Sequence, residues 1–323
     1  MKSGQRIDYL DIAKGIAMIS VISAHCNSIP DGSPSIIIMQ SAFLNNFSKT
    51  GVILLFIMSG YLYHVTDADN GYVSRKIKSL ICPWAISGII VYLYVHLRKP
   101  PLTFAGLLGF LLGDGSYLYY LTVLCALYLI FYVPIMRERE VLLICVAVGY
   151  AHTIFVPNSL GSFINPYLNI LNWIQYFAIG MLLQENKRTE NVKLRTLLRI
   201  LLPYLYLIII VVLSINKIRM EYWVGWSPII STIGAITICI SATCVSGMSC
   251  SDVLKSIGRG SLFIYLWHMP IAGIVAKVFG NNALLQFVLI RPIVVLLIVY
   301  LAMKLLDSIL EKRISIKAII GLR

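Results

Sequence analysis

The sequence contains few charged residues and no long polar stretch. Only 13% of its 323 residues are Asp, Glu, Lys or Arg, whereas 59% are hydrophobic, and the mean hydropathy is +0.83. A chain with so large an apolar fraction cannot bury its apolar surface inside one water-soluble globule. The polar stretches are only as long as loops, so we expect no soluble domain and predict a polytopic membrane protein.

The sequence also lacks the cysteine and histidine motifs of metal sites and of disulfide frameworks. Its 7 cysteines include no Cys-x-x-Cys pair, and an odd number argues against a secreted disulfide scaffold. Most of them lie in or beside apolar runs, where a small buried side chain is the usual interpretation. We therefore expect no metal cofactor.

Acidic residues are scarcer than basic ones. The 14 Asp and Glu residues stand against 27 Lys and Arg residues, which gives a formal net charge of +13. The basic residues gather in alternate segments between apolar runs, as the positive-inside rule predicts for loops that face the cytoplasm. Membrane topology thus explains the excess charge, and we expect no nucleic-acid partner.

The apolar runs are long enough to cross a bilayer about ten times, since a hydrocarbon core about 30 Å thick needs roughly 20 helical residues. We predict an all-α polytopic membrane protein with about ten transmembrane helices and with both the N- and C-termini cytoplasmic. We expect one integral membrane domain over residues 1–323 and no signal peptide. Residues 104–112 are apolar but too short to span. The predicted spans are residues 8–30, 47–65, 80–97, 117–136, 140–157, 167–184, 196–215, 226–246, 258–279 and 283–308.

The first predicted span carries ionisable side chains at membrane depth. A charge there costs about 2.5–3.5 kcal/mol on insertion scales, so each such residue marks a candidate functional site. The spacing of Lys14 and His25 places them within about 20° of one helix face and roughly 16 Å apart along the axis. Asp11 lies one turn before Lys14 and can pair with it. His268 lies inside the ninth span, and two imidazoles at this depth indicate a polar cavity.

Each of these groups also has a plainer interpretation. Lys14 can extend to the cytoplasmic headgroups while His25 reaches the outer interface. Arg75, Lys76 and Lys78 can be ordinary loop charges. They can equally converge on the phosphates of an anionic cofactor through charge-assisted hydrogen bonds. The residues alone leave both interpretations open.

Five segments together resemble the acyltransferase family 3 membrane proteins, which O-acylate cell-surface glycans. The similarity starts with a basic residue, ten intervening residues and a histidine in the first helix, followed by a Ser-Gly-aromatic motif in the second. The departure is Lys14, where many members have Arg: lysine keeps the charge but lacks the bidentate fork. The five segments are residues 9–17 with His25, 56–61, 75–83, 176–183 and 261–270.

The resemblance implies transfer of an acyl group, most often acetyl, from cytoplasmic acyl-coenzyme A to a sugar hydroxyl. His25 is the candidate base, because an imidazole with a pKa of about 6.5 accepts a proton at neutral pH. A covalent acyl-histidine is the alternative role for the same residue. The donor is expected to be acetyl-CoA, and no metal is required.

The same resemblance implies roles for further residues. Asp11 would orient Lys14. Lys14, or the Tyr265 hydroxyl with neutral His268, would donate hydrogen bonds to the oxyanion or the substrate. The residues expected to bind the donor's phosphates are Arg75, Lys76, Lys78 and Lys14. The residues expected to bind the acceptor at the outer ends of spans are Asp114, Tyr120, Asn172 and Trp173, although a plain aromatic belt explains each Tyr or Trp equally well.

The expected partners are a glycan or lipid-linked saccharide acceptor and the lipids of the cytoplasmic (inner) membrane, with a homo-oligomer left open. A secondary transporter or lipid-linked sugar flippase is the alternative function, because it would also have about ten spans and an intramembrane charge pair. Such a protein would form no covalent product. A non-enzymatic assembly partner is the third class, and it would tolerate replacement of His25 and Lys14.

Overall fold

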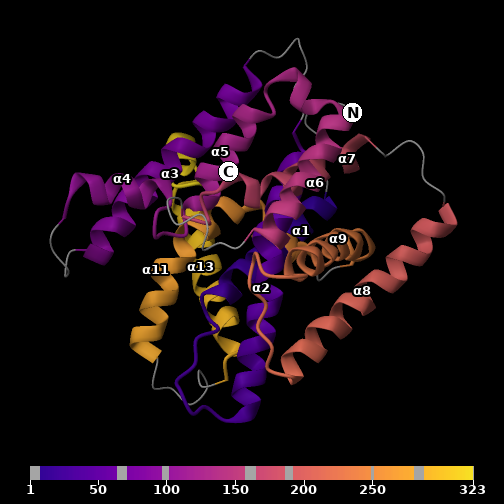
Figure 1. The fold of residues 1–323 in the computed structure, drawn as a ribbon. Coiled ribbons are helices and arrows are strands. Elements are labelled where there is room, and N and C mark those ends of the chain that lie inside the picture. Colours follow the sequence, from indigo (N-terminus) through magenta and orange to yellow (C-terminus); the bar gives the residue numbers. More distant parts are fainter. Residues whose placement is uncertain are drawn as a thin grey trace. The chain divides into compact units, whose positions relative to one another are not determined.

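The chain is helical throughout the part that its computed structural model describes (Figure 1). No strand occurs in that part, which confirms the helical class predicted from hydropathy. The ends of the predicted spans at residues 65, 97 and 157, and the start of the last one at 283, lie outside it. The described residues are 8–63, 71–96, 102–156, 165–185, 192–248, 251–279 and 287–322, without the side chains of 185, 192–200 and 279.

The described helices form two compact units. One unit comprises Met1–Leu55, Arg188–Tyr222 and Ile229–Met303, and the other comprises Phe56–Lys187, Trp223–Pro228 and Lys304–Arg323. The helices in chain order are α1 (Asp8–Ala24), α2 (Ser35–Tyr61), α3 (Tyr72–His96), α4 (Phe104–Leu112), α5 (Tyr119–Ile130), η1 (Pro134–Arg137), α6 (Arg139–Phe155), η3 (Ile170–Asn172), α7 (Ile174–Glu185), α8 (Val192–Ile215), α9 (Ser227–Val245), α10 (Ser251–Arg259), α11 (Ser261–Phe279), α13 (Ile290–Ile309) and α14 (Ile314–Ile319).

Five of the described helices are long and apolar enough to cross a membrane, namely α2, α3, α9, α11 and α13. Shorter apolar helices occupy other predicted spans: α5, α7 and the Leu201–Ile215 part of α8. The run at residues 104–112 forms α4, which is only 9 residues long, with Thr103 as its N-cap and Gly113 as its left-handed C-cap. The protein is therefore a helical membrane protein, while a count of about ten spans and cytoplasmic termini stay predictions.

The first two helices differ from the spans that hydropathy predicts. α1 ends at Ala24, and Pro30 lies in the irregular segment that follows it. α2 begins at Ser35, well before the predicted start at residue 47. A polar stretch at residues 45–50 separates the two apolar parts of α2, so hydropathy places the start of the span too late. Tertiary hydrogen bonds satisfy side chains of this stretch, as when Asn45 donates to the carbonyl of Met220 at 2.9 Å.

In the first unit, α1 is buried on all sides. Eleven of its 17 residues are buried, including the consecutive run Leu10–Ala13. A helix that is covered around its whole circumference belongs to the core of its unit. Its neighbours include α10 and α11, so these two helices decide which side chains meet those of α1.

The second unit contains a close contact between α2 and α7. A Cβ on Gly60 would collide with the carbonyl oxygen of Phe177, and one on Gly180 would collide with that of Ile57. Glycine is therefore required on both sides, as in small-residue contacts between membrane helices. Two of the segments that the sequence analysis singled out, 56–61 and 176–183, thus form the two sides of one helix contact.

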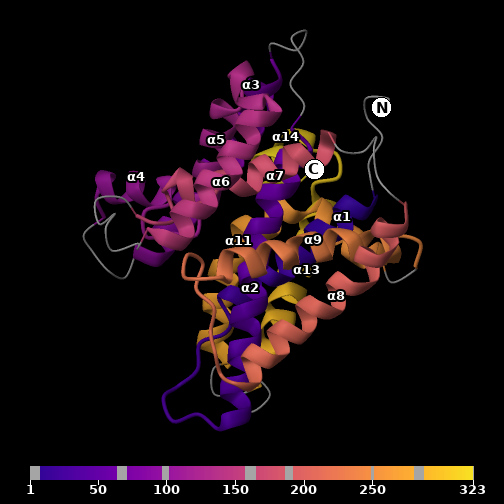
Figure 2. The same ribbon diagram turned by 45° about the vertical axis from the view of Figure 1, so that its right-hand side comes forward.

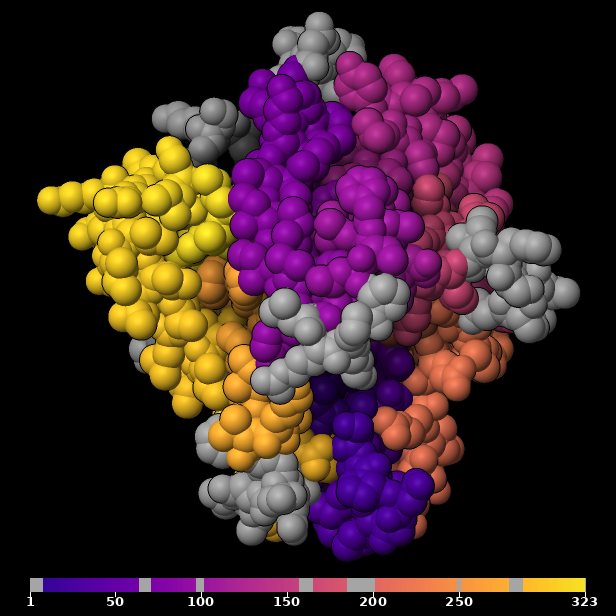
Figure 3. Space-filling model, turned by 90° about the vertical axis from the view of Figure 1, so that its left-hand side faces the viewer, coloured from indigo at the N-terminus to yellow at the C-terminus, as the bar shows by residue number. Residues whose placement is uncertain are grey.

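Three other helices of the second unit, α4, α5 and α14, pack on α3. α4 packs on α3 and lies at the edge of its unit in both ribbon views (Figures 1 and 2). α14, close to the C-terminus, also packs on α3, which contributes to the purple surface that faces the viewer in Figure 3.

Candidate functional site

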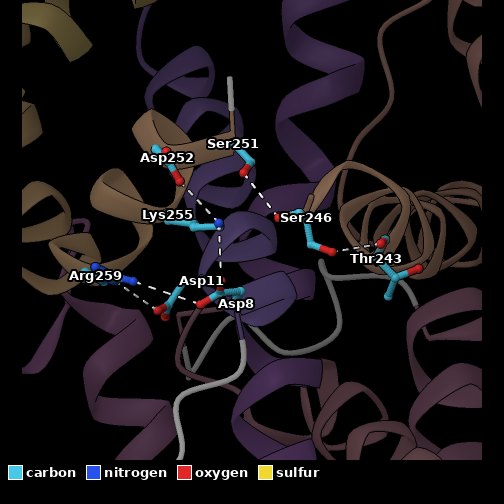
Figure 4. Close-up of polar contacts among 8 residues, drawn as sticks. All are labelled: Asp8, Asp11, Thr243, Ser246, Ser251, Asp252, Lys255 and Arg259. Atoms are coloured by element: carbon cyan, nitrogen blue, oxygen red, sulfur yellow. Dashed lines mark hydrogen bonds and ion pairs between the residues drawn. The ribbon is translucent and has the colours of Figure 1, made fainter. Parts of the chain in front are cut away.

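An ion network joins the start of α1 to α10 (Figure 4). The Nζ atom of Lys255 lies 3.2 Å from Oδ2 of Asp8 and 3.2 Å from Oδ1 of Asp252. Arg259 donates from Nε to Oδ2 of Asp11 at 3.4 Å, and its Nη2 lies 4.0 Å from Oδ1 of Asp8. The acids in the first turn of α1 and the base in the last turn of α10 also interact favourably with the dipoles of these helices.

Two glycines allow α10 to lie directly on α1. A Cβ on Gly15 would collide with the carbonyl oxygen of Leu254, and one on Gly258 would collide with that of Asp11. The two backbones therefore touch without side chains between them. This contact, rather than any local sequence pattern, brings Arg259 within reach of the Asp11 carboxylate.

Lys14 shares its carboxylate partner with Arg259. Its Nζ atom lies 3.8 Å from Oδ1 of Asp11, and its side chain is 27% exposed. The pairing expected from the helical spacing is thus present, although Arg259 is the closer cation. The role of Asp11 in orienting Lys14 remains a prediction.

His25 and His268 lie in contact within the first unit. Their ring centroids are 5.2 Å apart with an interplanar angle of 45°. His25 directly follows the last residue of α1, where its N–H donates to the carbonyl of Ile22 at 3.0 Å. His268 lies within α11 and is fully buried, whereas His25 is exposed rather than buried as expected. The two imidazoles that the sequence placed at membrane depth therefore form a pair.

The hydrogen bond of His268 determines its tautomer. Its Nδ1 atom lies 2.6 Å from the carbonyl oxygen of Tyr265, which is one helical turn earlier. A carbonyl oxygen only accepts, so Nδ1 carries the proton and Nε2 carries the lone pair in the neutral ring. The ring of Tyr265 lies beside it, with centroids 5.8 Å apart. Tyr265 thus contacts His268 through both its backbone and its side chain.

Lys14 lies in the second turn of α1, whereas His25 follows its last residue. The helix face between them carries Met18, Val21 and Ile22, which are 0%, 3% and 0% exposed. The shared face expected from their spacing is therefore polar only at its two ends. Lys14 and His25 act at separate places on the helix, so one small group cannot contact both.

The basic cluster of α3 lies in the second unit. Arg75 and Lys78 are exposed in the first turns of the helix. Lys76 is half-buried and lies over the ring of Tyr72, with Nζ 5.4 Å from the ring centroid. The assignment of these three cations to the donor's phosphates remains a prediction.

The four predicted acceptor residues also belong to the second unit. Asp114 is exposed and accepts a hydrogen bond from Asn165 at 3.2 Å. Tyr120, Asn172 and Trp173 are 8%, 1% and 0% exposed. Burial of this kind favours packing for Trp173, whose ring contacts other aromatic rings of the unit. Those rings are Phe56, Tyr119, Tyr176 and Trp223.

Sequence reasoning missed the basic residues that the packing brings to the two ends of α1. Lys255 precedes the predicted span 258–279 and Arg259 lies at its very start, so both resemble ordinary loop charges. Lys49 lies inside α2, in a polar stretch at the start of the predicted span 47–65. Within the described residues, no group of three or more His, Cys, Asp or Glu residues lies close enough together to hold a metal ion.

These features define a helical membrane protein with a histidine pair at one end of its first helix and an ion network at the other end. The family model described as an acyltransferase domain matches residues 7–304, nearly the whole chain. The chain therefore belongs to acyltransferase family 3 and is a membrane acyltransferase. No curated protein and no solved structure matches it significantly.

Proposed function

We propose that this acyltransferase moves an acyl group, acetyl in the simplest case, from cytoplasmic acyl-CoA to a hydroxyl of a glycan or lipid-linked saccharide in the cytoplasmic membrane. The contact between His25 and His268 is the observation that carries the proposal. It sets an exposed imidazole against a fully buried one. O-acylation needs a base beside the acceptor hydroxyl, and an exposed imidazole is suited to that task.

In the proposed reaction His25 is a general base. Its unprotonated nitrogen takes the proton of the acceptor hydroxyl as that oxygen attacks the thioester carbonyl carbon. The carbon–sulfur bond breaks when the tetrahedral intermediate collapses, and the imidazolium returns its proton to the departing thiolate. The products are an ester and free coenzyme A, and His25 is regenerated. The alternative, attack by the His25 nitrogen itself, would give an acyl-histidine and ping-pong kinetics.

His268 acts in this proposal as a positioning residue. Its Nδ1–H bond to the Tyr265 carbonyl holds the ring in one tautomer and one orientation. A ring held in this way limits the rotation of the imidazole packed against it, and catalysis depends on such placement. The Tyr265 hydroxyl is the proposed donor to the oxyanion or the substrate.

The donor's phosphates are proposed to bind basic side chains. Arg75 and Lys78 are exposed, and guanidinium and ammonium groups form charge-assisted hydrogen bonds with phosphate. Lys76 of the same helix completes the proposed set. Of the four acceptor residues expected from the sequence, Asp114 offers an exposed carboxylate to a sugar, whereas the burial of Trp173 favours packing.

The test is transfer of labelled acetyl from acetyl-CoA in inverted membrane vesicles from cells that make the native glycan. Wild type should place base-labile label on saccharide. His25→Ala should lower the rate by about 100-fold or more, the usual contribution of a general base, while acetyl-CoA binding is retained. His96→Ala is the matched control, since it removes an imidazole that stacks on Tyr92 in the second unit.

Two results would contradict the proposal. If His25→Ala transfers acetyl at the wild-type rate, His25 is not the base. If wild type transfers neither acetyl nor succinyl but moves glycan across the membrane, the protein is a flippase.

A further inference from the structure

Two arginines from distant parts of the first unit hold the segment that follows His25. Arg219 donates from Nη2 to the side-chain oxygen of Asn27 at 3.2 Å. Arg291 donates from Nη1 to the backbone carbonyl of Ser28. Both acceptors are neutral oxygens, so these two bonds position the guanidinium groups beside the segment that follows α1. The residues that these two arginines bind, Asn27 and Ser28, follow the proposed base His25 by two and three positions.

A third cation reaches the same end of α1 from α2. Lys49 is half-buried, and its Nζ atom lies 4.4 Å from the ring centroid of Tyr222. Its ammonium is near enough to act electrostatically on both His25 and Arg219. An ammonium over an aromatic face keeps its charge and remains able to attract an anion from its open side.

The described residues include one acid that acts on Lys49. Glu221 is the acid that acts on Lys49, and it is itself exposed. At the other end of α1, by contrast, Asp8, Asp11 and Asp252 stand against Lys14, Lys255 and Arg259, so the charges balance. Like charges held close together repel, and an anion that binds between them removes that cost.

We propose that Lys49, Arg219 and Arg291 bind a carboxylate or phosphate group carried by the saccharide acceptor, beside His25. Guanidinium groups match both anions in a bidentate fork, and the lysine adds a point charge. An acidic group anchored here would hold a neighbouring hydroxyl of the same molecule at the imidazole. The assignment to the acceptor rests on the proposed function; the presence of an anion site does not.

The first measurement uses anions rather than a full acceptor. The whole chain is placed in phosphatidylcholine nanodiscs, and its thermal unfolding midpoint is followed as inorganic phosphate, glucuronate or glucose is added at constant ionic strength. Phosphate and glucuronate should raise the wild-type midpoint, and glucose should not. Arg219→Gln and Lys49→Met should each weaken the apparent phosphate affinity about tenfold, as expected for one lost charge-assisted contact.

Lys277→Gln is the matched control, because it removes an exposed lysine of α11 that belongs to the same unit. Its response to phosphate should equal that of wild type. The proposal is overturned if wild type shows no response to phosphate, or if Arg219→Gln and Lys49→Met respond to it as wild type does.

Two further arms identify the source of the anion. Acetyl-CoA binding should be unchanged in Arg219→Gln and Lys49→Met; a tenfold loss would assign these cations to the donor's phosphates and overturn the acceptor assignment. Nanodiscs with phosphatidylglycerol should leave the phosphate response intact; its disappearance would assign the cations to lipid headgroups. Because binding is measured without turnover, a chain that binds phosphate here but transfers no acetyl contradicts the proposed function and not the anion site.

Discussion

Gly258 of α10 packs directly against the backbone carbonyl of Asp11 in α1. Because no side chain separates the two helices at this point, the next residue, Arg259, can reach the Asp11 carboxylate at 3.4 Å. Backbone packing and ion pairing thus depend on the same contact. The end of α1 that carries Lys14 is held in place by both.

Gly258→Ala tests this packing. The added Cβ would collide with the Asp11 carbonyl, and overpacking of this kind typically costs about 1–3 kcal/mol. We expect a lower unfolding midpoint in detergent. Gly273→Ala is the control, because Gly273 of α11 has open space where a Cβ would stand. Equal effects of the two substitutions would contradict the close contact between α1 and α10.

His268→Ala tests the positioning role of the buried imidazole. We expect a fall in kcat of about 100-fold, the size of effect seen when a catalytic group is misplaced by 1 Å, with little change in the KM for acetyl-CoA. The pH profile of kcat should also shift, because the neighbour of His25 has changed. His268→Asn keeps an N–H near the Tyr265 carbonyl and should restore the unfolding midpoint more than the rate. Parallel losses of midpoint and rate in both variants would indicate a purely structural role.

Lys255 predicts a pH dependence of stability. Hydrogen bonds to Asp252 and Asp8 raise the pKa of its ammonium. A lysine whose pKa is higher in the folded chain contributes stability below the unfolded pKa of about 10.4, and that contribution is lost as pH rises through the folded pKa. The unfolding midpoint of Lys255→Gln should therefore lie below that of wild type at neutral pH, and the gap should close in strong base. A gap that stays constant to high pH, or that also occurs with Lys277→Gln, would contradict this account.

Asn46→Ala tests the polar part of α2. The Asn46 side chain donates to the carbonyl of Ile218 at 3.0 Å and accepts from the N–H of Met220 at 2.8 Å. Removing this side chain leaves the Ile218 carbonyl and the Met220 N–H without these hydrogen bonds. An unsatisfied buried group of this kind costs about 1–3 kcal/mol of folding free energy. We expect a clear drop in the free energy of unfolding, measured by denaturant titration. Asn216→Ala removes an exposed side chain that donates to the carbonyl of Val212, and it should change the free energy of unfolding little. Comparable losses in the two variants would be evidence against the role of Asn46.

Much of the helical framework is predictable from composition and periodicity. The membrane class, most helix positions and the short capped run of α4 follow from hydropathy and from turn-forming residues. The start of α2 does not follow from them. The polar residues of α2 are typical of a loop. Their hydrogen-bond partners lie around Met220, too far along the chain for any local sequence window to include them.

The candidate site divides in the same way. The sequence identifies Lys14, His25 and His268 as costly groups at membrane depth, and the pairing of Asp11 with Lys14 follows from helical spacing. The sequence does not show that the two histidines are in contact. It also does not show that Arg259 and Lys49 lie near the side chains of this site. Each of these depends on which faces of separate helices meet.

The sequence by itself determined that this protein is a helical membrane protein and which of its residues are chemically unusual there. Hydropathy and charge belong to single residues and their chain neighbours, so they can be read without a fold. Only the tertiary structure decided that His25 meets His268 and that Arg259 meets Asp11, a residue 248 positions away. The second contact forms because the backbones of α1 and α10 touch, which glycines at their crossing points permit.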